Sequence, residues 1–152
     1  MRILVTVGTY KFDDLIKKVD EIALKSNQYF TCQIGEGSYK PDNCSSFVFS
    51  DRFHEKVNEV DLIITHAGAG TVYSLLERGK NLIVVPCLNR VDNHQLEITN
   101  YVVSKKYCLA CKDLSVLEET LYKAKDFFAK SKVQYKKHAF FKSSEIIQYI
   151  DI

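Results

Sequence analysis

The sequence has little of several residue types that mark specialised classes of protein. Its 152 residues include no tryptophan, one methionine, two prolines and six glycines, and no stretch of low complexity, which excludes collagen-like and disordered chains. Basic residues outnumber acidic ones by only 21 to 19, too small an excess for a dedicated nucleic-acid binder. With 46% hydrophobic residues, the chain has enough apolar surface for one globular domain and is too short for two.

Long hydrophobic runs are missing as well. No run approaches the roughly 20 residues of a membrane-spanning helix, and the longest candidates, 61–65 and 82–85, have the length of strands. The apolar stretch at the start is too short for a signal peptide, so we expect a cytoplasmic protein. Five cysteines, an odd number, favour reduced thiols over disulfides. Cys108 and Cys111 have no second pair that would complete a zinc site, so we expect no metal.

What the sequence does contain is a regular alternation of short apolar runs with longer amphipathic ones. This pattern predicts alternating strands and helices, and therefore a parallel α/β sheet. We expect strands over 3–7, 29–34, 46–49, 61–65, 82–85 and 107–110. We expect helices over 12–22, 51–59, 71–78, 93–105, 114–128 and 138–149. The predicted fold is a single Rossmann-like domain over residues 1–152, with a parallel sheet of about six strands flanked by helices.

A glycine-rich turn follows the strand expected over 61–65, the most convincing buried strand in the sequence. Residues 65–71 read Thr-His-Ala-Gly-Ala-Gly-Thr, between that strand and the next helix. Glycines allow close approach of an anion, and the free N–H groups at the start of a helix attract phosphate, so the segment indicates a phosphate site. The alternative is a tight turn that binds nothing. The segment matches neither the dinucleotide-binding fingerprint nor the P-loop.

A second polar loop, residues 86–95, follows the next strand. Asn93, His94 and Gln95 offer hydrogen-bond donors and acceptors with little charge, the chemistry that recognises sugar hydroxyls. The alternative is that Asp92 or Asn93 simply caps the following helix. Both loops should lie at the carboxyl edge of the sheet, where open α/β folds bind ligands.

The motif His-Ala-Gly-Ala-Gly-Thr, followed by Val-Val-Pro and Asp-Asn-His-Gln, resembles the C-terminal, nucleotide-sugar-binding half of glycosyltransferase family 28. The opening Val-Thr-Val-Gly-Thr with Phe-Asp-Asp-Leu resembles the small single-domain members, so the similarity covers about residues 1–110. Those members include the catalytic subunit of the dolichol-pathway N-acetylglucosaminyltransferase and bacterial capsule or exopolysaccharide galactosyltransferase subunits. Larger members have two such domains around a cleft, so the resemblance implies half of a GT-B glycosyltransferase.

The resemblance also implies roles for particular residues. The donor diphosphate would contact Gly8, Thr9, Gly68, Ala69, Gly70 and Thr71. Uracil and ribose would contact Phe49, Ser50, Phe53 and Ser74, and the sugar hydroxyls Asn93, His94 and Gln95. Ser74 departs from the family, which often has a ribose-binding glutamate there, and Glu77 follows one turn later. His66 is a candidate general base, or it braces the turn.

The implied function is that of a UDP-sugar-binding subunit of a two-component glycosyltransferase. It would transfer galactose or N-acetylglucosamine to a lipid-diphosphate-linked sugar in capsular, exopolysaccharide or O-antigen synthesis, without a cofactor or a metal. A membrane-associated partner subunit would hold it at the inner face of the membrane. Two alternatives are a non-catalytic subunit that enhances a partner transferase, and a nucleotide-binding protein unrelated to sugar transfer.

The end of the chain is basic and aromatic. Seven lysines and five aromatic residues lie within 123–142, which suits either a docking face for the partner or a solvated helix over core aromatics. We expect residues 131–152 to form a C-terminal helical extension that docks the partner. Deleting everything after Ala129 should then abolish copurification with the partner and leave the core folded.

Overall fold

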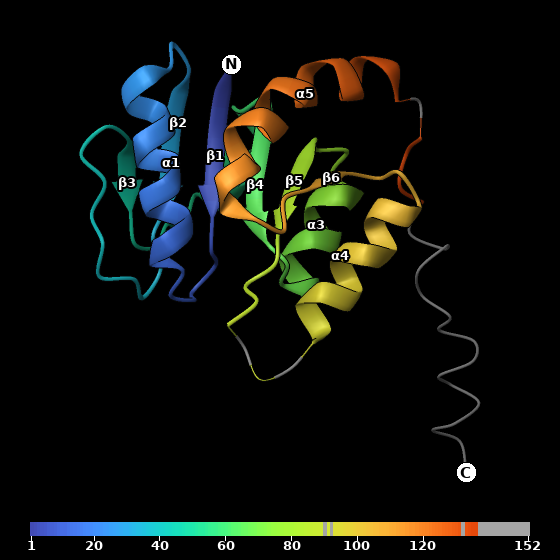
Figure 1. The fold of residues 1–152 in the computed structure, drawn as a ribbon, viewed down its shortest axis with the longest axis horizontal. Helices are drawn as coiled ribbons and strands as arrows, with labels where there is room; N and C mark the ends of the chain where they lie inside the picture. The colour runs from blue at the N-terminus through green and yellow to red at the C-terminus, as the bar shows by residue number, and fades with distance from the viewer. Residues whose placement is uncertain (90, 92, 132, 137–152) are drawn as a thin grey trace.

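The computed structural model describes residues 1–89, 91, 93–131 and 133–136. Strands and helices alternate through this part of the chain, as the sequence predicts (Figure 1). The strands are β1 (Arg2–Thr6), β2 (Tyr29–Gln33), β3 (Ser45–Phe47), β4 (Leu62–His66), β5 (Leu82–Val85) and β6 (Leu109–Ala110). The α-helices are α1 (Asp13–Lys25), α2 (Phe53–Asn58), α3 (Ala69–Glu77), α4 (His94–Ser104) and α5 (Leu117–Lys130), and a short 3-10 helix spans Leu114–Val116.

The strands form one parallel sheet in the order β3-β2-β1-β4-β5-β6. The predicted six-stranded parallel sheet is therefore confirmed. The chain starts in the middle of the sheet, builds outward through β2 and β3, and returns to place β4 on the other side of β1. All carboxyl ends meet at one edge, at the bottom of Figure 1. The direction of winding changes between β1 and β4, which is where ligands bind in open α/β sheets.

Helices cover both faces of the sheet. Side chains alternate between the faces along each strand, so Ile3 and Val5 join the core beneath α1 and α5, whereas Leu4 joins the core beneath α2, α3 and α4. The central strands are largely buried and consist mainly of Val, Ile and Leu, as is typical of parallel sheets. Figure 1 shows α1 and α5 in front of the strands.

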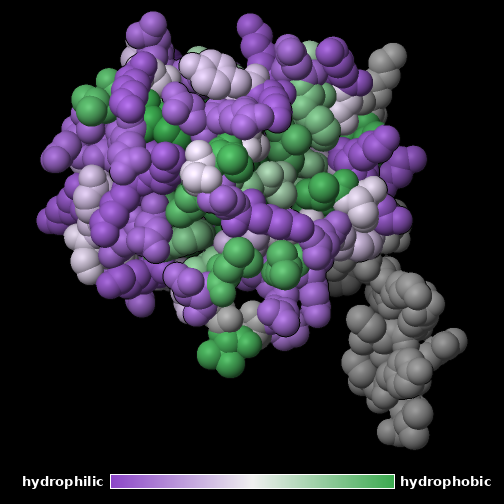
Figure 2. Space-filling view, viewed as in Figure 1, coloured by the Kyte–Doolittle hydropathy of each residue, from purple (hydrophilic) through white to green (hydrophobic). Residues whose placement is uncertain are grey.

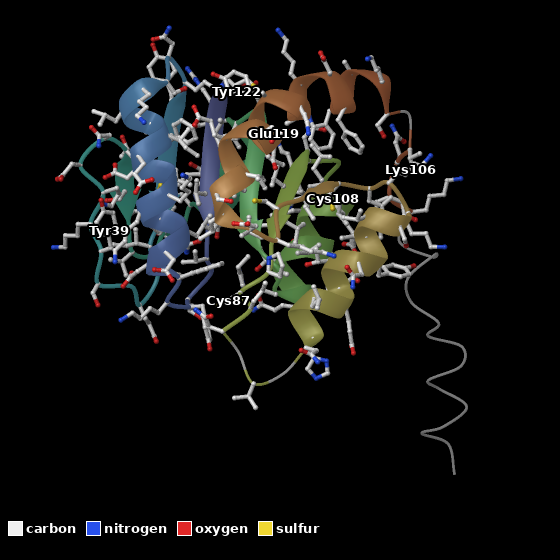
Figure 3. The ribbon with its side chains drawn as sticks, viewed as in Figure 1. Tyr39, Cys87, Lys106, Cys108, Glu119 and Tyr122 are labelled. Atoms are coloured by element: carbon white, nitrogen blue, oxygen red, sulfur yellow. The ribbon has the colours of Figure 1, made fainter. Side chains whose placement is uncertain are left out.

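The connection from β2 to β3 contains no helix among the described residues and is held by two carboxylates of α1. Asp13 accepts hydrogen bonds from the N–H groups of Ser38 and Tyr39 (3.3 and 3.2 Å). Asp20, which is buried, accepts from Tyr39 Oη (2.7 Å) and from two backbone N–H groups, those of Asp42 (3.1 Å) and Asn43 (2.7 Å). Tyr39 is labelled beside α1 in Figure 3. These hydrogen bonds therefore hold the connection against helix α1.

Several element boundaries differ from the prediction. Helix α3 begins at Ala69 rather than at residue 71, so Ala69 and Gly70 belong to its first turn. Helix α2 begins at Phe53, and Ser50 Oγ accepts a hydrogen bond from the Arg52 N–H (3.2 Å) instead of capping the helix. Strand β6 has only two residues because it lies at the edge of the sheet. The strand over 82–85 is confirmed, and Gly79 follows α3 in the left-handed conformation (φ 69°).

The chain after α5 leads back to the face formed by α3 and α4. Residues 133–136 are not helical, and the Tyr135 ring packs against Tyr107 at 5.2 Å and Tyr73 at 6.1 Å between centroids. Tyr135 is thus partly buried and packs against the core beneath α3 and α4. The helix predicted over 138–149, and with it most of the predicted extension, lies outside the described residues.

Candidate functional site

Two glycine-containing turns meet at the switch point of the sheet. One follows β1 and contains Gly8 and Thr9; the other follows β4 and contains Ala67 and Gly68. Gly8 has a φ of 63°, a conformation that favours glycine, and the Tyr10 N–H donates to Val7 O (3.1 Å) to close the first turn. Because β1 and β4 are paired in register from Ile3 with Leu62 to Thr6 with Thr65, the two turns emerge side by side.

The side chain of His66 lies between these two turns. A Cβ atom added to Gly8 would come within 3.2 Å of the imidazole Cε1, and one added to Gly68 would overlap the same ring. Both glycines are thus needed for space around the histidine. The ring acts as a spacer that sets the distance between the two turns. This geometry supports the bracing interpretation of His66, whereas it provides no direct support for proton transfer.

The start of α3 offers a binding position for an anion. Gly68 is the N-cap and makes no side-chain cap, and the first turn carries no acidic residue. N–H groups in the first turn of a helix have no partner within the helix, and the helix dipole is positive there. Gly70 is exposed, and apart from its chain neighbours and the nearby backbone of its own helix, no described atom would lie within 4 Å of a Cβ there. A phosphate can therefore approach the backbone of Ala69, Gly70 and Thr71 closely.

A small pocket opens beside this helix start, between α2 and α3. Its volume is about 190 Å³. Four residues assigned to the donor from the sequence line it: Phe53, Gly70, Thr71 and Ser74. His54, Val57, Leu75 and Arg78 complete the lining. The structure thus brings two of the four expected uracil and ribose residues, Phe53 and Ser74, to the expected diphosphate residues Gly70 and Thr71.

Phe49 and Ser50 are placed differently from Phe53 and Ser74. Neither lines the pocket between α2 and α3. Phe49, two residues after the end of β3, is 73% exposed, and the Ser50 hydroxyl accepts a hydrogen bond from the Arg52 N–H. A planar base could stack on an exposed phenyl ring, so their assignment to uracil stays a prediction.

The loop between β5 and α4 places its three polar residues unequally. Gln95 is buried, and its Oε1 accepts a hydrogen bond from the N–H of Cys87 (2.9 Å), the residue labelled at the start of the loop in Figure 3. Asn93 and His94 are exposed at the beginning of α4. Asn93 is the N-cap by position, yet its side chain makes no capping hydrogen bond. Asn93 and His94 therefore face solvent, whereas Gln95 stabilises the loop.

The same loop carries apolar side chains into solvent. Leu88 is 57% exposed and Val91 is fully exposed. Figure 2 shows hydrophobic atoms at the lower tip of the molecule, which is the position of this loop in Figure 1. Neighbouring exposed apolar residues on a protein surface indicate contact with another protein or with a membrane.

Sequence reasoning missed four polar residues near the site. Arg78 and His54 line the pocket between α2 and α3. Thr6 and Gln33 are buried beneath the Gly8 turn, where Thr6 Oγ1 donates to Gln33 Oε1 (2.6 Å) and accepts from the Gly8 N–H (3.2 Å). A glutamine at an inward position of a strand was the available signal, because buried polar side chains require partners.

The cysteines form no site in the described residues. All five are free thiols. Cys108 and Cys111 lie in the cores on opposite faces of the sheet, so the pair cannot hold one metal ion between them. Burial raises the pKa of the Cys108 thiol to about 12. No group of three metal-ligating side chains is found in the described ranges, and none of the helices described there is long and apolar enough to cross a membrane.

The fold is that of one half of a two-domain GT-B glycosyltransferase. The crystal structure of MurG from Acinetobacter baumannii superposes with a TM-score of 0.68 at 20% identity, over 84% of this chain and 42% of that one. This similarity establishes the architecture of the sheet and its helices.

The chain belongs to the glycosyltransferase family 28 C-terminal domain family, whose model matches residues 2–150. The human UDP-N-acetylglucosamine transferase subunit ALG13 is 34% identical over 122 residues, which are 72% of this chain and 11% of the human protein. The UDP-N-acetylglucosamine–N-acetylmuramyl-(pentapeptide) pyrophosphoryl-undecaprenol N-acetylglucosamine transferase of Flavobacterium psychrophilum is 27% identical over 115 residues, 71% of this chain and 31% of that protein. The chain thus spans a minor part of both relatives.

Proposed function

We propose that this chain is the donor-binding subunit of a two-component glycosyltransferase. The observation that carries the proposal is the uncapped start of α3, which lies beside the Gly8–Thr9 turn at the switch point of the sheet. Neutral backbone donors and a helix dipole suit a diphosphate and keep their positions during the reaction. When the bond to the sugar breaks, negative charge develops on the diphosphate, and the same donors stabilise it there.

We propose UDP-N-acetylglucosamine as the donor. The names of the human and the Flavobacterium relatives both specify this sugar nucleotide, which favours it over UDP-galactose. Uracil and ribose would occupy the pocket between α2 and α3, and the sugar would lie toward Asn93 and His94. Gln95 would then act chiefly by holding the loop, since its Oε1 is engaged by Cys87.

The acceptor we propose is a lipid-diphosphate-linked sugar. The name of the Flavobacterium relative specifies a pyrophosphoryl-undecaprenol acceptor, which supports this class. Our expectation of capsular, exopolysaccharide or O-antigen synthesis stays a proposal. The general base would come from the opposite half of the cleft, because His66 packs between the two glycine turns.

The partner would be a membrane-associated subunit that supplies the second half of the cleft and keeps this chain at the inner membrane surface. Two observations support a partner: the chain matches one half of a two-domain fold, and the human relative is named as a subunit. We propose that the basic segment after α5 docks it. Because Tyr135 packs against the core, deletion should begin after Lys136 instead of after Ala129.

Titration calorimetry of the purified chain tests donor binding. The ligands are UDP, UDP-N-acetylglucosamine, UDP-galactose and, as a nucleotide control, ADP. Thr71→Ala removes a hydroxyl at the start of α3 and should weaken UDP binding about 3- to 10-fold. Thr120→Ala is the matched control, because its hydroxyl donates within α5 to Val116 O (2.9 Å). Equal binding of ADP and UDP would instead indicate a general nucleotide-binding protein.

A second candidate function is a non-catalytic enhancer of the partner transferase. It is favoured by Ser74, because none of the described residues that line the pocket between α2 and α3 is a carboxylate that could bind ribose. Activity of the assembled complex separates the two candidates. A donor-binding subunit loses activity on Thr71→Ala with assembly intact, whereas an enhancer keeps it.

A further inference from the structure

A buried polar pair lies directly beneath the turn that follows β1. Thr6 has no exposed surface and Gln33 only 6%, although both occur in strands built mainly from apolar residues. They are direct neighbours in the register of β1 with β2. Buried polar groups reduce stability unless they are hydrogen-bonded, so this pair has a cost that an apolar pair would avoid.

The hydrogen bonds of the pair have a definite direction. A threonine hydroxyl has one proton, and here that proton goes to Gln33 Oε1 at 2.6 Å. The oxygen then has lone pairs left for the Gly8 N–H, which donates to it at 3.2 Å. The glutamine carbonyl thus orients the hydroxyl so that it accepts from the turn.

The end of β2 also touches the turn through its backbone. A Cβ added to Gly35 would overlap Tyr10 O and come within 2.8 Å of Gly8 O. The N–H groups of Gly8 and Tyr10 turn inward to Thr6 and Val7, and the exposed residues of the turn are Thr9 and Tyr10. Thr9 directly follows Gly8, so its hydroxyl and N–H are the groups that the turn can direct toward the start of α3.

We propose that Thr6 and Gln33 are positioning residues for the donor diphosphate: their buried hydroxyl–amide pair holds the Gly8 N–H inward and thereby aims Thr9 at the phosphates. The inference rests on the proposed donor-binding function. Neither residue touches the donor, and both act through the conformation of the turn. Because the pair is neutral, it fixes the turn without placing a negative charge beneath the diphosphate.

The test measures two quantities on the full chain, the UDP dissociation constant and the hydrogen-exchange protection of the Gly8 amide. Thr6→Val keeps the shape of the side chain and removes the hydroxyl. It should weaken UDP binding about 3- to 10-fold and accelerate exchange at Gly8. Thr6→Ser retains the hydroxyl and should restore both. Gln33→Leu should resemble Thr6→Val, and the double variant should bind no worse than either single variant, because the two residues act as one unit.

Val19→Ala is the control for general destabilisation, since it removes buried volume from α1 away from the turn. It should lower stability and leave the UDP affinity unchanged. Unaltered UDP affinity in Thr6→Val would overturn the positioning role, and so would fully additive losses in the double variant. If the wild-type chain failed to bind UDP, both this inference and the proposed function would fall. Normal wild-type binding with unaffected variants would overturn this inference alone.

Discussion

Two connections of this domain treat their polar groups in opposite ways. Between β2 and β3, the side chains of Asp13 and Asp20 accept hydrogen bonds from four backbone N–H groups and from the Tyr39 hydroxyl. Between β5 and α4, the described residues show one such hydrogen bond, from the Cys87 N–H to Gln95 Oε1. The first connection uses its polar groups internally, whereas Asn93 and His94 at the end of the second are exposed, with His94 Nδ1 3.7 Å from the equally exposed Glu97. A loop that is available to a ligand is thus recognised by polar groups that are exposed and not used to hold the loop in place.

The largest expected effect on stability comes from removing hydrogen bonds that hold the connection between β2 and β3. Asp20→Ala removes one acceptor from the Tyr39 hydroxyl and two backbone N–H groups, and should lower the free energy of unfolding by about 3 kcal/mol. Urea denaturation at neutral pH measures it. Asp14→Ala is the matched control, because Asp14 lies on the same helix and is exposed. Equal losses in both variants would show that the connection contributes little to stability.

Acid should weaken the same connection selectively. Burial acts to raise the pKa of Asp20, but hydrogen bonds from Tyr39, Asn43 and Asp42 outweigh it and hold that pKa below its ordinary value of 3.8. The pKa of Asp13 is lowered in the same way by the N–H groups of Tyr39 and Ser38 and by Lys11, against the opposing effect of burial. The unfolded chain then binds more protons, so this stabilisation is present above pH 3.8 and is lost as the pH falls below it. Unfolding followed by fluorescence between pH 2 and 6 should show a shallower decline for Asp20→Asn.

A smaller loss is expected in the second connection. Gln95→Leu leaves the Cys87 N–H without its acceptor and should cost about 1 to 2 kcal/mol of stability. Gln95→Glu retains an acceptor at this position and should recover part of that loss. The comparison of the two variants by thermal denaturation tells whether the side chain stabilises the loop. If both variants lost UDP-N-acetylglucosamine binding at unchanged stability, Gln95 would be a direct sugar contact instead.

The smallest effect on stability should come from the two exposed residues. Asn93→Ala and His94→Ala should each change the free energy of unfolding by less than about 0.5 kcal/mol, since neither side chain caps or packs the helix. Their effect should appear in the difference between UDP-N-acetylglucosamine and UDP binding. If either variant lost as much stability as is expected for Gln95→Leu, the conclusion that Asn93 and His94 do not stabilise this connection would be wrong.

The strands and helices could be predicted from local sequence patterns. Where contacts between distant residues decide the structure, the prediction was less accurate. The apolar run Leu82–Val85 and the turn signal at Gly79 are readable from neighbouring residues, and the structure confirms both. The start of α3 was placed two residues too late, because Gly70 disfavours a helix by intrinsic propensity. Tertiary context outweighs that preference here.

The candidate site follows the same division. The glycine turn and the helix after it were visible in sequence, because phosphate-binding turns are continuous segments. The pocket between α2 and α3 is also lined by Arg78 and His54, which lie outside the glycine-rich turn (65–71) and the polar loop (86–95). The Thr6–Gln33 pair joins two strands, and its partner residues become neighbours only once the sheet register is known. A single sequence holds no periodic signal for such a pairing.

The position of β1 in the middle of the sheet has a consequence for synthesis on the ribosome. Among the strands of this domain, β1 is synthesised first. One of its two neighbours is β4, and the pairing of Ile3 with Leu62 closes a long loop of chain. Until β4 has left the exit tunnel, the apolar flank of β1 has no partner on that side. The two glycine turns can therefore meet only after β4 has emerged, and until then β1 exposes a strand edge that is open to mispairing or chaperone binding.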